Sequence, residues 1–337
     1  MRRLTVLELC TGGGGQALGL EMAGIDCVGA VELERTACET LRHNRPQWNV
    51  VQGDLHEYDA KDYVGVDVVA AGVPCPPFSV AGKQLGASDE RDLFPEAIRV
   101  IEQCRPIAVL LENVPGFASS KFSGYRRELF GRLERLGYTT EWQLMNASDY
   151  AVPQLRPRFV LVAMRQPFFS NFEWPIPQSE RSYVGPVLAD LMASRGWPGA
   201  LMWAARANRI APTVVGGSKK HGGPDLGPTR AKNEWRQLGV DPMGIADDSP
   251  DSSLPSDVFP RLTVRMVARL QSFPDDWNFA GRKTAAYRQV GNAFPPLVAH
   301  AVGTAIRKAL LGAYTTKKNT AGQLRLFDAA RNKVVRN

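Results

Sequence analysis

The stretch from Leu4 to Glu21, LTVLELCTGGGGQALGLE, determines the fold that we expect. Its first six residues form an apolar run typical of a buried strand, and four consecutive glycines then lead into a helix-like segment. A glycine turn between a strand and a helix lets backbone N–H groups approach a ligand closely. The spacing of Gly12, Gly14 and Ala17 also satisfies GxGxxA, so a dinucleotide, another nucleotide-like ligand and a merely tight turn all remain open.

Alternating apolar and amphipathic segments continue to about Met164. The apolar runs lie at 27–32, 49–54, 66–72 and 107–113, and helical patterns lie at 14–24, 35–44 and 92–104. Strands this apolar, separated by helices, indicate a mainly parallel sheet covered on both faces. Two further strand-like segments, 138–146 and 158–164, have no helical pattern between them and predict a hairpin at the sheet edge. We therefore expect an α/β domain with a doubly wound, mainly parallel sheet and a ligand at the carboxyl ends of its strands.

The composition divides the chain into four parts. Residues 1–173 and 261–312 carry the periodic segments, while residues 174–260 are rich in Gly, Pro, Trp and Ser and have weak periodicity. That composition predicts a smaller, loop-rich domain inserted into the first. Residues 313–337 form a basic tail.

The formal net charge of +7 reflects two basic regions. Eight Lys and Arg and one Asp lie from Arg307 to Asn337, and eight Lys and Arg with two acidic residues lie from Arg195 to Arg236. Such segregation indicates an anionic partner, although a solvated chain end explains the tail equally well. Five cysteines without a CxxC pair and four scattered histidines predict neither a disulfide framework nor a metal site. With no signal peptide and no run of about 18 apolar residues, a soluble cytoplasmic protein is expected.

Acidic residues close two of the predicted strands beside the glycine turn. Glu32 ends the second apolar run and Asp54 ends the third. A carboxylate at such a place can accept hydrogen bonds from ribose hydroxyls. Two of them beside a glycine turn favour an adenosine pocket over ordinary strand-end acids.

The fourth strand leads to a cysteine in the sequence GVPCPPF. Pro74, Pro76 and Pro77 limit the backbone freedom around Cys75 and would hold its thiol in place. A structural cysteine is the common alternative, but a proline-rich turn is a poor place to bury one. The next strand ends near Glu112, which would bring a carboxyl group to the same sheet edge as a candidate acid or base.

Two arginines follow the first strand of the predicted hairpin. Arg156 and Arg158 are two positions apart in QLRPRFV, so they share one face of an extended segment. They can bind a carbonyl oxygen or a phosphate, although in isolation a pair of surface cations is the simpler interpretation.

The motifs CTGGGG, VELE, GD, GVPC, ENV, QLRPR and YRQVGNAFPP occur in the order of the conserved blocks of the C5-cytosine-specific DNA methyltransferases. The chain resembles that family over residues 4–164 and 261–310. The resemblance implies a class I S-adenosylmethionine-dependent methyltransferase fold, with S-adenosylmethionine as cofactor and double-stranded DNA as substrate. It makes residues 174–260 the target-recognition region. A monomer near the nucleoid is the expected state, and a cognate restriction endonuclease is a candidate partner.

The resemblance also implies roles for individual residues. Cys75 would be the nucleophile, Glu112 the acid at the cytosine ring, and Arg158 with Arg156 a contact to the base. The residues implied around the cofactor are Cys10, Thr11, Gly12, Gly14, Gly15, Glu32, Leu33, Asp54, Leu55, Pro74, Asn292 and Ala293. The candidate DNA contacts are Ser79, Arg206, Arg209, Lys219, Lys220, His221, Arg230 and Lys232. The chain departs from the family at Cys10, where Phe is common, and at Pro76, where Gln is usual.

The implied reaction needs these residue types. Addition of a thiolate to C6 of cytosine makes C5 nucleophilic, and a carboxylic acid at N3 stabilises the charge that this addition creates. Because C6 cannot be reached in a stacked duplex, the target base must be flipped out. The polar segment 79–93 is expected to close over it.

Four other functions compete with this one. An amino-methyltransferase could use the CPPF motif, but cysteine is a weak hydrogen-bond acceptor for an amino group. An RNA cytosine methyltransferase would share the fold, although the large region 174–260 favours DNA. An NAD-dependent oxidoreductase would explain the glycine turn and Glu32 but leaves Cys75 without a role. A non-catalytic DNA-binding regulator would tolerate Cys75→Ala without loss of function.

Overall fold

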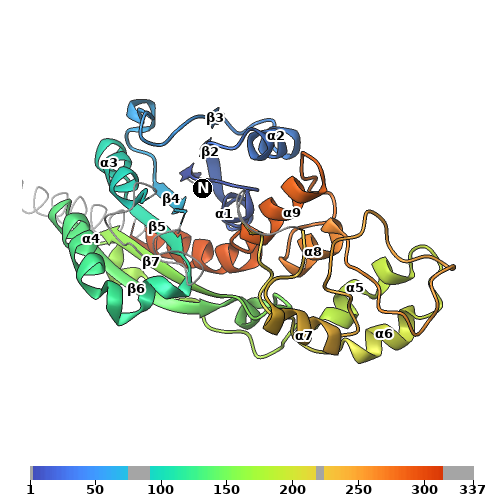
Figure 1. The fold of residues 1–337 in the computed structure, drawn as a ribbon. Coiled ribbons are helices and arrows are strands. Elements are labelled where there is room, and N and C mark those ends of the chain that lie inside the picture. Colours follow the sequence, from blue (N-terminus) through green and yellow to red (C-terminus); the bar gives the residue numbers. More distant parts are fainter. Residues whose placement is uncertain (1–2, 75–91, 218–223, 314–337) are drawn as a thin grey trace, which may run out of the picture.

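A central β-sheet organises the computed structural model, which describes residues 3–74, 92–217 and 224–313 (Figure 1). The described residues form a seven-stranded sheet in the order β3-β2-β1-β4-β5-β7-β6. Its strands are β1 (Leu4–Leu9), β2 (Ile25–Glu32), β3 (Val50–Gln52), β4 (Val68–Gly72), β5 (Ala108–Asn113), β6 (Tyr138–Asn146) and β7 (Pro157–Arg165). The pairs among β1 to β5 are all parallel, whereas β7 runs antiparallel to both β5 and β6. The expected mainly parallel sheet and the hairpin at its edge are confirmed.

Helices cover both faces of the sheet, as the apolar character of the strands requires. The first four are α1 (Gly15–Met22), α2 (Arg35–Asn44), α3 (Phe94–Cys104) and α4 (Ser123–Arg135). Val6, Ala70 and Leu110 share one core with α1 and with a further helix at 296–313. Their strand neighbours, such as Val69 and Leu111, share a second core with α3 and α4. The sheet is therefore doubly wound.

The region after β7 consists of short helices and irregular segments beside the sheet (Figure 1). Its helices are α5 (Val184–Ala193), α6 (Ala200–Arg206) and α7 (Thr229–Gln237), and the chain returns to the sheet through α8 (Val264–Leu270) and α9 (Lys283–Asn292). Single 3-10 turns lie at Lys61–Tyr63, Pro115–Ala118, Ser120–Phe122, Ala147–Tyr150 and Phe169–Asn171. Among the described residues, no helix has the length and apolarity that a bilayer crossing requires.

The first helix packs closely against the start of the last described helix. A Cβ atom at Gly15 would lie 2.2 Å from the backbone oxygen of Phe294. At Gly19 it would lie 2.3 Å from the oxygen of Pro296 and 2.5 Å from the Cβ of Ala299. These glycines therefore allow α1 to approach the 296–313 helix and fix where the glycine turn before it sits.

Gly19→Ala is expected to lower the free energy of unfolding by roughly 1–3 kcal/mol, because the added methyl group overpacks a contact between two backbones. Urea denaturation followed by circular dichroism measures the effect. Gly124→Ala in α4 is the matched control, because a Cβ there meets no described atom within 4 Å. The control should be neutral or stabilised by about 0.5–1 kcal/mol. Equal stability of the two variants would show that the packing of α1 is looser than described.

Candidate active site

Residues that could take part in catalysis or binding meet at the carboxyl ends of the parallel strands. The glycine turn follows β1, Glu32 ends β2, and Pro74 lies two residues after β4. Because β7 is antiparallel to β5, its first residues lie beside the last residues of β5, and Glu112 pairs with Val160. Arg158 is thereby brought to the edge at which Glu112 lies. The sheet topology thus gathers groups that are far apart in the sequence.

Glu112 and Arg158 form a nearly buried ion pair. The Nε atom of Arg158 lies 2.8 Å from Oε1 of Glu112, and each side chain is only 11% exposed. Burial raises the pKa of Glu112, while the charges of Arg158 and Arg156 oppose that shift. A carboxyl group with a raised pKa can hold a proton nearer to neutrality than an exposed one and then donate it.

Asn113 ties the end of β5 to the end of β4. Its Nδ2 atom donates to the backbone oxygen of Val73 at 3.4 Å, and its Oδ1 accepts from the backbone N–H of Val114 at 2.8 Å. This contact holds the strand end that leads through Pro74 to position 75. Cys75 and Ser79 themselves lie outside the described residues, as does most of the segment 79–93.

Arg156 occupies a different environment from Arg158. Its side chain is fully buried, and its guanidinium donates to the backbone oxygens of Val214, Gly291 and Ala293 at 2.7, 2.8 and 2.9 Å. Burial lowers its pKa, and the like charge of Arg158 adds to this effect. These contacts join the start of β7 to the segment before residue 218 and to the end of α9. The expected contact of Arg156 with a base stays a prediction.

The glycine turn is held by the acid at the end of β2. The backbone N–H of Gly12 donates to Oε2 of Glu32 at 2.7 Å, and that of Glu34 donates to Oε1 at 2.8 Å. Gly12 and Gly14 have φ values of 56° and 88°, which a residue with a side chain rarely adopts. Thr11 supports the same turn through its hydroxyl group, which lies 3.3 Å from the backbone oxygens of Glu8 and Val31 and can donate to either.

An aromatic side chain that the sequence did not single out supports the turn from behind. The indole N–H of Trp277 donates to the backbone oxygen of Gly13 at 3.1 Å. A Cβ at Gly14 would lie 2.8 Å from the Trp277 ring, so Gly14 has no room for a side chain. Trp277 lies in an irregular segment between α8 and α9, and only the apolar character of FPDDWNF could have indicated its burial.

The other predicted cofactor residues surround the turn in different environments. Leu33 is 59% exposed just after β2, whereas Leu55 is buried. Asp54 is half exposed, and its Oδ1 accepts from the backbone N–H of His56 at 3.0 Å. Cys10 is half-buried with a φ of 53°. Asn292 donates from Nδ2 to the backbone oxygen of Gly217 at 3.3 Å.

The described residues around the glycine turn fit an adenosyl cofactor. A Cβ at Gly12 would meet no described atom within 4 Å, so the turn faces open space. The carboxylate of Glu32 can accept further hydrogen bonds at both oxygens. Leu33 presents an exposed apolar surface that can pack against a flat base.

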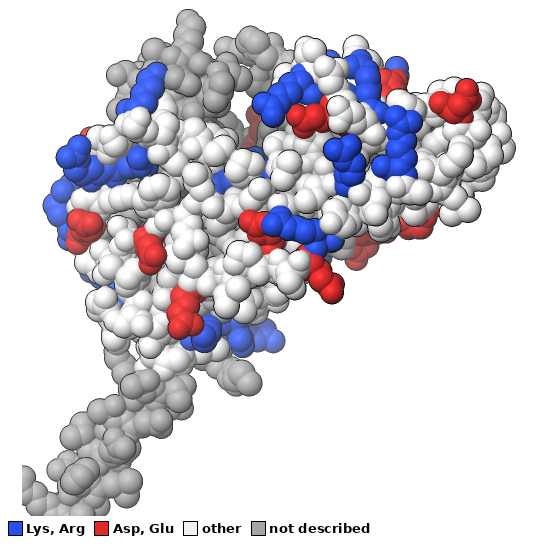
Figure 2. All heavy atoms as spheres, turned by 90° about the horizontal axis from the view of Figure 1, so that it is seen from below, with Lys and Arg blue, Asp and Glu red and all other residues white. Residues whose placement is uncertain are grey.

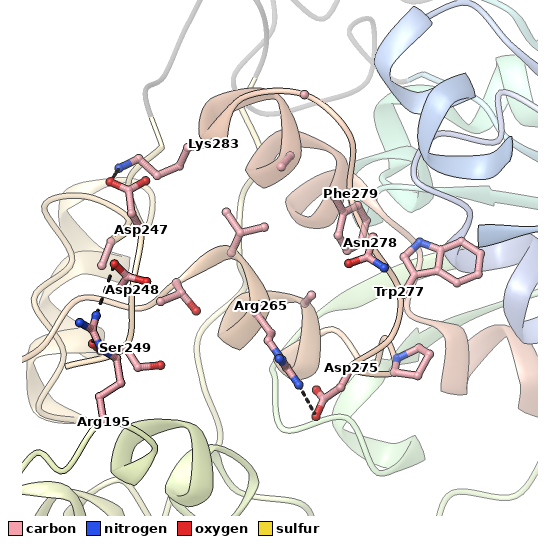
Figure 3. A pocket seen from close by; sticks show the side chains of 17 residues that line it. Arg195, Asp247, Asp248, Ser249, Arg265, Asp275, Trp277, Asn278, Phe279 and Lys283 are labelled. Carbon is pink, nitrogen blue, oxygen red and sulfur yellow. Dashed lines mark hydrogen bonds and ion pairs between the residues drawn. The ribbon is translucent and has the colours of Figure 1, made fainter. Parts of the chain in front are cut away.

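A cavity of about 490 Å³ lies elsewhere, between the region around Asp247 and the helices α8 and α9 (Figure 3). Its basic side chains are paired with acids: Lys283 with Asp247 at 2.9 Å, Arg195 with Asp248 at 3.3 Å and Arg265 with Asp275 at 3.2 Å. None of the predicted catalytic or cofactor residues that the structure describes lines it. Trp277 lines it and also contacts the glycine turn, so the cavity lies behind the turn and is not the cofactor site.

Basic side chains lie on both sides of the face shown in Figure 2, and one group lies toward the right, on the side of the region after β7. Arg230 is 93% exposed and pairs with Glu234 at 3.1 Å, whereas Lys232 is only 19% exposed and pairs with Asp225 at 2.8 Å. Arg206 and Arg209 are exposed. Lys219, Lys220 and His221 lie outside the described residues.

Comparison with known proteins places these features in a family. The family model for C-5 cytosine-specific DNA methylases matches residues 4–308. The chain is 54% identical over 314 residues to the Type II methyltransferase M.NaeI of Lentzea aerocolonigenes, covering 92% of this chain and 76% of that protein. It is 49% identical over 312 residues to the Type II methyltransferase M.NgoMIV of Neisseria gonorrhoeae, covering 91% and 98%.

Solved structures support the fold. A putative DNA modification methyltransferase encoded within an E. coli prophage superposes with a TM-score of 0.64 at 24% identity, covering 91% of this chain and 99% of that one. The Dnmt2 methyltransferase of S. pombe gives a TM-score of 0.62 at 19% identity, covering 91% and 99%. Since the family model spans nearly the whole chain and the relatives are this similar, the chain belongs to the C-5 cytosine-specific DNA methyltransferases, which use S-adenosylmethionine as methyl donor.

Proposed function

We propose that Cys75, Glu112 and Arg158 perform the methyl transfer of this DNA (cytosine-5-)-methyltransferase. The observation that supports this most strongly is the buried Glu112–Arg158 ion pair beside the end of β4. The strand end before Cys75 is tied to β5 by Asn113, so a thiol that follows Pro74 starts from the same sheet edge as the carboxyl of Glu112.

In this reaction the thiolate of Cys75 adds to C6 of a flipped cytosine, and Glu112 gives a proton to N3. The addition converts the ring into an enamine whose C5 is nucleophilic. Arg158 then faces the Glu112 carboxylate that remains, and it stabilises this charge in a site with little water. After methylation the C5 proton passes to water, expulsion of the Cys75 thiolate restores the aromatic ring, and N3 returns its proton to Glu112.

The glycine turn and Glu32 are proposed to hold the cofactor, with Leu33 against its adenine ring. Bound there, S-adenosylmethionine supplies an electrophilic methyl group. Glu32 would accept hydrogen bonds from ribose hydroxyls while it keeps the turn in place through Gly12. Asp54, Leu55 and the segment around Asn292 would close the remaining sides.

The region 174–260 is proposed to bind a specific site in double-stranded DNA. Its exposed cations, Arg206, Arg209 and Arg230, suit phosphate contacts, and base contacts are expected from the same region. Because the similar relatives are Type II methyltransferases, we infer that a cognate restriction endonuclease recognises the same site. The enzyme would act as a monomer, since it modifies one base at a time.

Mass spectrometry of nucleosides tests this function. Duplex DNA and structured RNA are incubated separately with the protein and S-adenosylmethionine, and 5-methylcytosine is expected in the DNA alone. Glu112→Gln, which keeps the size but loses the acidic proton, should slow methylation by about 10²- to 10⁴-fold. Glu102→Gln, on the exposed side of α3, is the matched control and should retain the wild-type rate.

Other products would contradict the proposal in distinct ways. N4-methylcytosine or N6-methyladenine as the product would exclude attack at C6. 5-methylcytosine found in RNA alone would show that the substrate is RNA and not DNA. Full activity of Glu112→Gln would remove this carboxyl group from the mechanism.

A further inference from the structure

Two buried polar side chains near the active site are not used by the mechanism above. Glu8 in β1 has no exposed surface, and neither of its carboxyl oxygens has a hydrogen-bond partner among the described residues. Gln16 in α1 is 4% exposed, and its Nε2 atom also lacks a described partner. Unpaired buried polar groups are costly, so these two call for an explanation.

The sheet brings both groups to Glu112. Leu7, Leu9 and Leu111 belong to the core on one face, so the side chains of Glu8 and Glu112 point to the opposite face. The strand between them is β4, in which Ala70 pairs with Glu8 and Gly72 pairs with Glu112. These small residues leave room for longer side chains to meet above β4.

The side chains of Glu112 and Gln16 both approach Gly72. A Cβ at this position would lie 3.6 Å from Oε2 of Glu112 and 3.7 Å from Oε1 of Gln16. Oε2 of Glu112 and Oε1 of Gln16 therefore both lie near the backbone of Gly72. Glu8 lies on the neighbouring strand β1, opposite Ala70, which is two residues before Gly72.

We propose that Glu8 and Gln16 are positioning residues that form a hydrogen-bonded chain ending on Glu112. In this chain the protonated carboxyl of Glu8 donates to Oε1 of Gln16, and Nε2 of Gln16 donates to Oε2 of Glu112. These contacts involve rotation about the terminal side-chain torsions, which have broad minima. The proposal rests on the catalytic role proposed for Glu112.

These hydrogen bonds give a partner to one carboxyl oxygen of Glu8 and to Nε2 of Gln16. They also fix the plane of the Glu112 carboxyl from two sides, because Arg158 holds Oε1 and Gln16 would hold Oε2. Oε2 retains a second lone-pair position for the proton that goes to cytosine N3. A carboxyl held in this way needs no reorientation when the flipped base arrives.

The proton on Glu8 makes the chain sensitive to pH. Burial raises the pKa of Glu8 to about 8, and the negative charge of Glu112 adds to the effect. Among the described residues, Cys27 on β2 and Cys10 after β1 also face Glu8, and burial raises the pKa of both, so neither supplies a charge near neutrality. The cations Arg156 and Arg158 face Glu112. Above about pH 8 an ionised Glu8 can no longer donate a hydrogen bond to Gln16.

Single-turnover methylation rates measured from pH 6 to pH 9.5, a range on the order of two pH units either side of the Glu8 transition, test the proposal. Glu8→Gln still donates but does not titrate, so it should keep the rate at pH 7 within about threefold and lose the alkaline fall near pH 8. Glu8→Leu and Gln16→Met remove the chain, and each should slow the reaction by about 10- to 100-fold, the range typical of residues that orient an active group. The KM values for DNA and cofactor should be unchanged.

Thermal stability gives a second readout that does not need activity. Glu8 binds a proton on folding between its ordinary pKa of 4.5 and about 8, so the native protein holds more protons than the unfolded chain in this window. The wild-type protein should therefore lose stability as the pH rises through it, and Glu8→Gln should lose less. If Glu8→Leu fails to fold, the rate profiles of Glu8→Gln and Gln16→Met still decide the matter.

Two results would contradict the proposed hydrogen bonds between Glu8, Gln16 and Glu112. One is an alkaline fall with the same midpoint in Glu8→Gln and in the wild type. The other is a wild-type rate for Gln16→Met. If these occur while Glu112→Gln is inactive, the proposed function survives without the chain, whereas full activity of Glu112→Gln removes both.

Discussion

Replacing Cys75 with serine is expected to abolish 5-methylcytosine formation while leaving the protein folded. A hydroxyl group is far less acidic than a thiol, so it cannot add to C6, and without that addition C5 stays too electron-poor to accept a methyl group. Loss of a nucleophile in an enzyme typically lowers the rate by a factor on the order of 10⁶. Transfer of a radiolabelled methyl group to duplex DNA under single-turnover conditions measures the change.

A substituted substrate separates the nucleophile from a merely structural cysteine. In a duplex with 5-fluorocytosine at the target, the fluorine cannot leave as the C5 proton does, so the bond between Cys75 and C6 should persist. The wild-type protein should then form a denaturation-resistant adduct with DNA, and Cys75→Ser should form none. Cys104→Ala is the matched control, because this buried thiol lies at the end of α3, beside the first residues of β4 and β5 rather than their last. Adduct formation by Cys75→Ser would exclude the proposed nucleophile.

The central strands of the sheet could be predicted from local pattern because they are buried on both faces. Strand β1 (Leu4–Leu9), helix α2 (Arg35–Asn44) and strand β6 (Tyr138–Asn146) begin and end where the sequence predicts. In these elements the hydrophobic period and the flanking residues favour the same structure. The fold class follows from the same alternation.

Helix α4 (Ser123–Arg135) had no clear pattern because one of its inward-facing residues is an arginine. Arg126 is buried, and its guanidinium donates to the backbone oxygens of Phe117 and Ser119 and lies 5.6 Å from the Trp142 ring. A cation that is satisfied by backbone oxygens can take an apolar position. A sequence pattern that counts only apolar residues does not detect this.

The position of a site residue could be predicted from the sequence where it depends only on the strand that carries the residue. Glu32 and Glu112 lie at strand ends, so the parallel sheet brings them to one edge. The partners that decide what a side chain does are set by tertiary contacts, and these could not be predicted. Gln16 and Trp277 reach the site from positions whose sequence gives no signal, and Arg156 finds its partners far along the chain.

Arg156→Leu is expected to destabilise the protein by roughly 3–5 kcal/mol, since it leaves three buried backbone oxygens without their charged donor. Those oxygens belong to Val214, Gly291 and Ala293, which come from two segments that pack on the start of β7. For a chain of 337 residues this corresponds to a fall in melting temperature on the order of 5 °C. Differential scanning calorimetry measures it, and Arg127→Leu on the exposed side of α4 is the matched control.

Arg156→Lys distinguishes the geometry of the guanidinium from its charge. A lysine keeps the positive charge but cannot reach three oxygens at once with a planar fork, so it should recover only a small part of the lost stability. Gly216 and Gly291 pack against each other beside these oxygens, and Gly216 would meet Asn292 if it had a side chain. Loosening this junction should therefore also weaken cofactor and DNA binding at temperatures at which the protein is still folded. Wild-type stability of Arg156→Lys would show that charge alone holds the junction together.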